Sequence, residues 1–577
     1  MLVPSRPLRG WTLAITLALV STACDASEAI LGEQRPPVSE AAAAFAHAWT
    51  DGDYEAMAAH LDSASAEDWT PARLERSFEA ALSSAGMTIS SVLLVPPDGE
   101  ESEEVAELSV TISYTTEVLD EEVVMSGPLE MTYSEADEAW QVAWDKDLLW
   151  PGVIGGRSFA IATRFSKRAP LLDRNGRKLA VGPADERRYP FGSMAGTTIG
   201  HIEPVKKKDI PDGEALEPGD LIGGSGLEEG FNDRLAGIPD VKLQVVGRKG
   251  RAVATIARQP GTSPRRVKTT LDVRVQQVAE SAYGSTIGGA VVLDPRTGDI
   301  LAAVASSPFN PVNYVGVAGI EPFNRALSGL YPAGSSMKVM TAATALEIGA
   351  FKPDSQLTGP AEYKGVRNFE SGAFGTLSFA SALQNSVNTA FAQIAEKIGP
   401  KRSKRYADLF GFNREPSMAL QAARSSFPFP EDEGDLMWGA IGQAQTLATP
   451  LQMATVAATI ANGGKRMEPR ISLFVKPKGE RVVSKMTARI MTELMENVVE
   501  GGTGVGAQIS GVRIAGKTGT AEVDVGGVRK NHAWFISFAP AGDPKVAVAV
   551  VSEYGGVGGQ VAAPLARAIL TQVLPLI

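Results

Sequence analysis

The sequence predicts a multidomain protein with an N-terminal α+β domain, a mostly β middle domain and a C-terminal α/β domain. The 577-residue chain is long enough for about three domains of ordinary size. In the N-terminal region, apolar residues recur first with the period of a helix and then with the period of a strand. In the C-terminal region, segments with the helical period alternate with segments typical of strands. Charge divides the chain similarly: residues 51–150 carry 3 basic and 24 acidic residues, whereas residues 151–577 carry 49 and 38.

Composition excludes several classes of protein. A hydrophobic content of 44% and a charged content of 21% exclude a disordered chain. The basic residues are too dilute for a protein that binds nucleic acid. Cys24 is the only cysteine, so we expect no internal disulfide. The four histidines are scattered without ligand spacing, and we expect no metal site and no cofactor.

The first residues have the features of a secretory signal. An apolar run over residues 11–20 follows basic residues, is too short to span a bilayer, and is followed by small residues and Cys24. We expect a signal peptide over residues 1–23 and a tether over residues 24–36. Cys24 is either incidental in a removed peptide or a lipid acceptor, although Ser21 replaces the aliphatic residue usual in such signals. We expect lipidation, and a place on the extracytoplasmic face of the cell membrane.

Residues 37–150 form the predicted α+β domain. Helix-period apolar residues open it, with a helix N-cap expected at Asp53 and a third helix beginning after Pro71. Alternating residues over 106–114 and 140–144 then predict half-exposed antiparallel strands. Because no acid–base or metal cluster stands out, we interpret this acidic domain as a soluble spacer or partner-binding domain.

Residues 151–268 form the middle domain, and residues 269–577 the C-terminal domain. In the middle domain, residues 173–176 give a hairpin-turn signal. The C-terminal domain opens with a helix capped by the segment Thr270-Leu-Asp272, followed by a hairpin around residues 295–298. Its later elements are strands over 512–525, 532–538 and 546–552 and a helix over 564–574 that covers the sheet.

Three short motifs carry the candidate chemistry. In Ser335-Ser-Met-Lys338, the serine opens a helical run, and residues i and i+3 lie on one face, so Lys338 can reach the hydroxyl. A serine becomes a nucleophile when a base such as a neutral lysine takes its proton. Taken alone, Ser335 is better explained as a helix N-cap.

The second motif is Ser386-Val-Asn388 and the third is Lys517-Thr-Gly-Thr520. Ser386-Val-Asn388 alone fits a polar loop. The third motif lies inside a strand, where Lys517 can donate to a carboxylate and Gly519 leaves room for the backbone of a ligand.

In this order, the three motifs resemble those of the serine acyltransferases that include penicillin-binding proteins and β-lactamases. The segments Arg168–Gly176 and Gly224–Gly237 resemble the pedestal, or dimerisation, domain of class B penicillin-binding proteins. The pattern F-x-x-x-W-x-x-G-D-Y-x-A-M, which starts at Phe45, resembles the nuclear-transport-factor-2-like cone fold. The whole chain therefore resembles the methicillin-resistance type of class B enzyme. The resemblance implies a β-lactamase-like C-terminal domain with an antiparallel sheet flanked by helices.

The resemblance implies D,D-transpeptidation of peptidoglycan stem peptides and acylation by β-lactams. Its implied catalytic residues are Ser335, Lys338, Ser386 and Asn388. Its implied substrate-binding residues are Lys517, Thr518, Gly519 and Thr520. Ser335 would form the acyl-enzyme with Lys338 as base, and Ser386 would relay a proton to the leaving group. Backbone N–H groups of Ser335 and Thr520 would form the oxyanion hole.

Two other readings stay open. One is a hydrolase, either a β-lactamase or a D-alanyl-D-alanine carboxypeptidase; Glu415 is the nearest candidate for the activating glutamate, but the residues after it do not fit. The other is a non-catalytic sensor of β-lactams or muropeptides. Ala333 and Ala444 stand where the family often has proline and glycine. By family analogy we expect a separate membrane glycan polymerase as partner.

Overall fold

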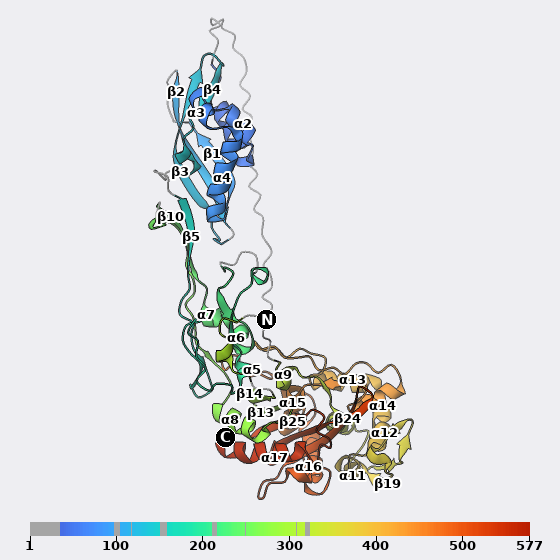
Figure 1. Ribbon diagram of the computed structural model, residues 1–577. Coiled ribbons are helices and arrows are strands. Elements are labelled where there is room, and N and C mark those ends of the chain that lie inside the picture. Colours follow the sequence, from blue (N-terminus) through green and yellow to red (C-terminus); the bar gives the residue numbers. More distant parts are fainter. Residues whose placement is uncertain are drawn as a thin grey trace.

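The computed structural model describes residues 35–96, 104–116, 118–150, 158–210, 216–247, 250–306, 309–317 and 323–577. The predicted signal peptide, Cys24 and nearly all of the predicted tether lie outside these described residues. Three domains follow one another along an elongated molecule, with the N-terminal and C-terminal domains at opposite ends (Figure 1). Within the described ranges, no helix is long and apolar enough to cross a membrane.

The N-terminal domain packs helices against one antiparallel sheet of order β1-β2-β3-β4. Its helices are α1 (Val38–Asp51), α2 (Tyr54–Ala59), α3 (Ser63–Asp68) and α4 (Pro71–Ala85). Its strands are β1 (Met87–Val95), β2 (Val105–Thr116), β3 (Val123–Ser134) and β4 (Ala139–Val142). Asp53 caps α2 by accepting from Ala56 N at 3.0 Å, as predicted. The sequence does not reveal β1, whose pairing shifts between Ile89 and Ser91 and so breaks the alternation.

Aromatic rings fill the space between these helices and the sheet. Trp49 and Trp144 meet edge to face with ring centroids 5.0 Å apart, and Phe45 and Phe78 pack around them. The same core continues into the middle domain, because Phe159 of β5 (Ser158–Arg164) belongs to it. The aromatic residues spaced along this part of the sequence therefore form the core of a domain.

The middle domain is mostly β, as predicted. Its three small sheets have the orders β11-β10-β5, β12-β6-β7 and β8-β9. The strands not yet named are β6 (Leu171–Leu172), β7 (Lys178–Ala180), β8 (Ile202–Pro204), β9 (Leu221–Gly223), β10 (Asp240–Val246), β11 (Ala252–Gln259) and β12 (Val267–Lys268). Its short helices are α5 (Gly196–Ile199), α6 (Gly226–Gly230) and α7 (Asn232–Ala236).

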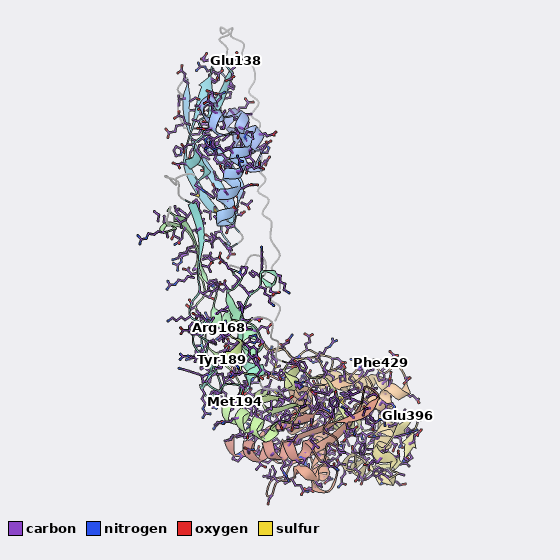
Figure 2. All side chains as sticks on the ribbon, in the orientation of Figure 1. Glu138, Arg168, Tyr189, Met194, Glu396 and Phe429 are labelled. Atoms are coloured by element: carbon purple, nitrogen blue, oxygen red, sulfur yellow. The ribbon has the colours of Figure 1, made fainter. Side chains whose placement is uncertain are left out.

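A buried ion cluster joins the two sequence motifs of this domain. Arg168 Nε and Arg187 Nε each donate to a different carboxylate oxygen of Glu228 at 2.8 Å, and Arg168 also donates to Asn232. All three charged side chains are buried, and Figure 2 shows Arg168 and Tyr189 in the middle domain, between the N-terminal and C-terminal domains. Burial lowers the pKa of Arg168, and Glu228 opposes this effect. The motif residues thus hold the interior of the domain together.

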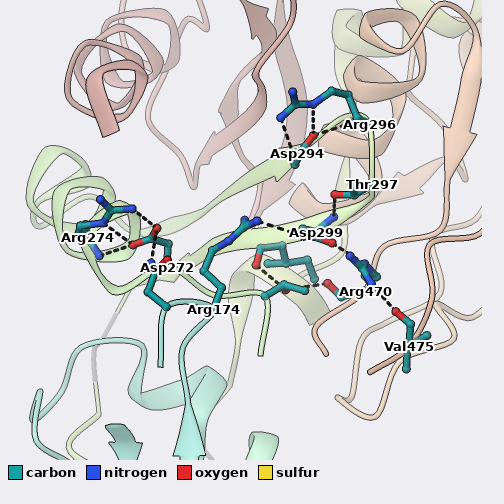
Figure 3. Close-up of polar contacts among 12 residues, drawn as sticks. Arg174, Asp272, Arg274, Asp294, Arg296, Thr297, Asp299, Arg470 and Val475 are labelled. Carbon is teal, nitrogen blue, oxygen red and sulfur yellow. Dashed lines mark hydrogen bonds and ion pairs between the residues drawn. The ribbon is translucent and has the colours of Figure 1, made fainter. Parts of the chain in front are cut away.

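Further polar contacts fasten the middle domain to the C-terminal domain (Figure 3). The guanidinium of Arg174 lies 3.6 Å from the Asp299 carboxylate, which also pairs with Arg470. Asn175 donates to Asp272 at 2.9 Å. Asp272 itself caps α8 (Val273–Tyr283) by accepting from the N–H of its second residue. The predicted hairpin turn therefore serves as the joint between the domains.

The C-terminal domain is built on a five-stranded antiparallel sheet of order β14-β13-β25-β24-β23. The strands are β13 (Gly288–Asp294), β14 (Asp299–Ala305), β23 (Ala515–Val525), β24 (Val528–Ala539) and β25 (Val546–Ser552). α8 and α17 (Ala562–Val573) cover one face, and α15 (Pro450–Ala461) covers the other. The other helices of six or more residues in the described part of this domain are α10 (Lys338–Glu347), α11 (Phe379–Gln384), α12 (Asn388–Ile398), α13 (Pro400–Leu409), α14 (Glu433–Ala440) and α16 (Lys485–Gly501).

The predicted start of the third-motif strand at Val512 is wrong. Ile509 and Val512 instead pair with each other in a tight turn, and β23 begins at Ala515. β23 is an edge strand of the sheet, so one side of its backbone is left open to a further strand or a ligand.

Candidate active site

The three motifs come from separate elements that meet at the open edge of the sheet. Ser335 lies in the 3-10 turn η4 (Gly334–Met337), directly before α10. Ser386 lies between α11 and α12, with the left-handed φ of +58°. Lys517 lies on β23. The helix predicted at Ser335 therefore begins with a 3-10 turn, which is more tightly wound than an α-helix.

Lys338 is held at the centre of the site. Its Nζ donates to Ser386 O at 2.7 Å and to Asn388 Oδ1 at 2.6 Å, and it lies 3.3 Å from Ser386 Oγ. The side chain is fully buried. Burial, and then the nearby charge of Lys517, hold the pKa of Lys338 well below its usual value.

These contacts suit the neutral amine of Lys338. A neutral amine has two N–H groups and one lone pair. The two oxygens that can only accept, Ser386 O and Asn388 Oδ1, take both N–H groups. The lone pair is then left for a hydroxyl, which is the requirement for a general base.

Lys517 also contacts the second motif, at the same Ser386 hydroxyl that lies near Lys338. Its Nζ donates to Ser386 Oγ at 2.9 Å and to Thr518 O at 3.0 Å. Burial lowers the pKa of Lys517 to about 7. The Ser386 hydroxyl therefore lies between two buried lysines, 2.9 Å from Lys517 Nζ and 3.3 Å from Lys338 Nζ.

Ser335 is half-buried and lies three residues before Lys338, in the turn that precedes α10. Within the described residues, the hydrogen bonds of Lys338 Nζ do not include the Ser335 hydroxyl, although Lys338 begins the helix that follows. Catalytic contacts of this kind often tighten only when substrate binds. η4 also lies against β23, because a Cβ on Gly334 would be 2.9 Å from Thr520 O. Ser335 and Thr520 are thus neighbours, as an oxyanion hole between them requires.

Gly519 allows this close approach. A Cβ at Gly519 would lie 2.9 Å from Ala333 O and 3.1 Å from Ser336 N, both in the backbone around the nucleophile. The sequence suggests that Gly519 makes room for a ligand; the structure adds that it makes room for the serine turn.

The two departures from the family pattern have conformational explanations. Ala333 has a φ of −74°, which is close to the angle that proline imposes. Ala444 has a φ of +55°, in the left-handed region where glycine is favoured. Both alanines therefore have backbone angles that proline and glycine, respectively, readily adopt.

Three residues near the motifs were not predicted from the sequence. Thr503 Oγ1 lies 2.6 Å from Thr518 Oγ1. Arg367 O accepts from Asn388 Nδ2 at 2.8 Å, and the buried Asn368 accepts from the backbone of Thr389 at 3.1 Å. A Gly-Gly-Thr-Gly run, residues 501–504, indicates a tight turn around Thr503 but does not identify the partner of its hydroxyl.

Glu415 does not belong to this site. It is exposed, and the small cavity that it lines with Arg414 and Arg466 has none of the motif residues among its lining. The structure thus brings Ser335, Lys338 and the other two motifs together and leaves Glu415 outside.

Comparison with known proteins agrees with this arrangement. Three family descriptions match: the penicillin binding protein transpeptidase domain over residues 288–571, the penicillin-binding protein dimerisation domain over residues 175–269, and the NTF2-like N-terminal transpeptidase domain over residues 38–156. Peptidoglycan D,D-transpeptidase PbpA of Mycolicibacterium smegmatis is 38% identical over 367 residues, which are 54% of this chain and 74% of that protein. The chain belongs to the class B penicillin-binding proteins.

Other relatives of this class B penicillin-binding protein cover more of it. Peptidoglycan D,D-transpeptidase MrdA of Acinetobacter baumannii is 29% identical and covers 66% of this chain and 65% of its own length. The crystal structure of PBPA from Mycobacterium tuberculosis matches with a TM-score of 0.57 at 31% identity, over 71% of this chain and 98% of that one. Pseudomonas aeruginosa PBP2 matches with a TM-score of 0.61 at 29% identity, over 71% and 97%.

Proposed function

We propose that this protein is a D,D-transpeptidase that crosslinks peptidoglycan stem peptides through an acyl-enzyme on Ser335. The observation that carries the proposal is the meeting of Lys338 and Lys517 at the Ser386 hydroxyl beside Ser335. Such a cluster provides a base, a proton relay and a cation for a carboxylate in one place. Family membership and the named relatives support the same activity.

In the acylation step, the Ser335 hydroxyl attacks the carbonyl between the two terminal D-alanines. Its proton passes to the lone pair of Lys338, which is neutral because it is buried beside a second lysine. The developing oxyanion lies near the backbone N–H groups of Ser335 and Thr520, each worth about 3–4 kcal/mol in comparable sites. The carboxylate at the end of the substrate pairs with Lys517 and the hydroxyls of Thr518 and Thr520.

The second half of the reaction uses the same proton path in reverse. Ser386 gives a proton to the leaving D-alanine amine and regains one from Lys338, so the C–N bond breaks and an ester to Ser335 remains. The amine of a second stem peptide then attacks this ester, its proton returns through the same groups, and Ser335 is released. Asn388 keeps Lys338 in place throughout, through its 2.6 Å contact.

β-Lactams would react with the same serine. Their amide carbonyl and carboxylate occupy the positions of the substrate carbonyl and terminal carboxylate, and opening of the ring leaves an ester on Ser335. The acyl-enzyme forms as with substrate, and its lifetime distinguishes a transpeptidase from a β-lactamase.

One assay separates the transpeptidase from the hydrolase and the sensor. The purified protein is given a pentapeptide donor ending in D-alanyl-D-alanine and a fluorescent D-amino acid as acceptor. A transpeptidase releases D-alanine and incorporates the acceptor, whereas a carboxypeptidase releases D-alanine without incorporation. A protein that does neither, while still binding penicillin, would be a sensor and would contradict the proposal.

We also propose that Cys24 carries a lipid and anchors the chain on the extracytoplasmic face of the cell membrane. The short apolar run, the small residues before the only cysteine and the extracytoplasmic location of peptidoglycan support this anchoring. Labelling with a fatty-acid analogue, compared between wild type and Cys24→Ala, tests it: a labelled Cys24→Ala variant would contradict it. A membrane glycan polymerase as partner rests on family analogy, and co-purification from detergent extracts tests that partner.

A further inference from the structure

Thr503 connects the second and third motifs on the carboxylate side of the site. It lies in the turn after α16, where its N–H donates to Gln384 O at 3.2 Å, two residues before Ser386. Its hydroxyl lies 2.6 Å from the Thr518 hydroxyl. We propose that Thr503 is a positioning residue for carboxylate recognition, acting through the Thr518 hydroxyl; this rests on the transpeptidase function proposed above.

The turn holds Thr503 tightly from both sides. A Cβ on Gly502 would lie 2.5 Å from Gln384 O, and a Cβ on Gly559 would lie 2.5 Å from Thr503 O. Neither position has room for a side chain, so the backbone of Thr503 is fixed by close packing. The Thr503 side chain is nevertheless exposed. Its hydroxyl is thus set in place at an accessible surface beside β23.

The direction of the hydroxyl pair depends on what Thr518 faces. Of two hydroxyls in contact, one donates and the other keeps its own proton for a third group. When an anion lies beside Thr518, donation from Thr503 to Thr518 leaves the Thr518 proton free for the anion. Each hydrogen bond in such a chain strengthens the next. Thr503 therefore turns Thr518 into a donor that is already aimed at a carboxylate.

The other hydroxyl of the third motif is oriented in the same manner. Thr520 Oγ1 accepts from Gly558 N at 3.2 Å. The proton of the Thr520 hydroxyl therefore points away from Gly558 and is also free for an anion. Thr518 and Thr520 lie two residues apart on one strand, and their side chains leave the same face. Two different loops therefore pre-orient the two hydroxyls, Thr503 for one and Gly558 for the other.

The test compares a penicillin with its methyl ester, in which the carboxylate is blocked. The second-order acylation rate is measured for wild type, Thr503→Val, Thr503→Ser and the control Thr571→Val, which removes an exposed hydroxyl from α17. We expect Thr503→Val to lower the rate with benzylpenicillin about fivefold to tenfold, in keeping with the loss of one hydrogen bond next to a charge. Its rate with the ester should change less than about twofold, and Thr503→Ser should restore the rate with the acid.

Several outcomes would overturn the proposal. If Thr503→Val lowers the acylation rates with benzylpenicillin and with its methyl ester equally, Thr503 has only a structural role. If the rate with benzylpenicillin is unchanged, Thr503 does not position the Thr518 hydroxyl. A similar loss in Thr571→Val would show that the effect is not specific to the site. Thr503→Ala repeats the comparison if the valine variant melts early. Failure of the proposed function would look different, because wild type would then not be acylated on Ser335 or would not incorporate the acceptor in the pentapeptide assay.

Discussion

Replacing Gly519 by alanine tests how closely the nucleophile turn depends on β23. The added Cβ would lie 2.9 Å from Ala333 O, 2.9 Å from Trp534 Cβ and 3.1 Å from Ser336 N. Carbon contacts prefer about 3.5 Å or more, so the backbone around Ser335 must move by about half an ångström. Overpacking of this kind costs about 1–3 kcal/mol of stability.

The effect on activity should exceed the effect on folding. A displacement of about 1 Å at a catalytic group costs about 100-fold in rate, so we expect Gly519→Ala to slow acylation by penicillin about tenfold to 100-fold. Gly542→Ala is the matched control, because its Cβ would meet only the flexible side chain of Arg513 at 3.8 Å. Stopped-flow acylation and thermal melting are measured on both variants. A folded Gly519→Ala protein with the wild-type acylation rate would show that the turn around Ser335 does not depend on this close contact with β23.

Three further perturbations follow from the buried charges. Acylation by a penicillin should fall as pH rises through about 7, because Lys517 then loses the charge that pairs with the carboxylate; a rate that keeps rising to pH 9 would contradict this. Lys338→Ala should lower the acylation rate about 100-fold to 10,000-fold, the usual contribution of a general base, and a loss below tenfold would exclude Lys338 from that role. Glu228→Gln should destabilise the fold by about 3–5 kcal/mol, because two buried arginines lose their carboxylate; an unchanged melting temperature would contradict it, with the exposed Glu493→Gln as control.

Part of the candidate site could be predicted from the sequence because each motif is short and local. Ser335 and Lys338 are neighbours on one turn, so their relation follows from helical spacing. The convergence of that turn with Ser386 and Lys517 followed from resemblance to a known family and not from spacing. Only the structure shows that both lysines are buried and meet at one hydroxyl.

The parts that were missed depend on contacts between distant segments. Thr503 acts through Thr518, 15 residues away, and a threonine in a glycine-rich turn has no local signal for such a partner. Strand β3 contains Gly127 and Pro128, which disfavour a strand in the sequence, yet it pairs fully with β2. Tertiary pairing therefore overrides local preference at these places.

Mass spectrometry of the acylated protein shows which residue is the nucleophile. After incubation with benzylpenicillin and proteolysis, we expect one penicilloyl adduct, on the peptide that contains Ser335, and no adduct in the Ser335→Ala variant. An adduct on another residue, or one that survives Ser335→Ala, would contradict the role of Ser335 as nucleophile.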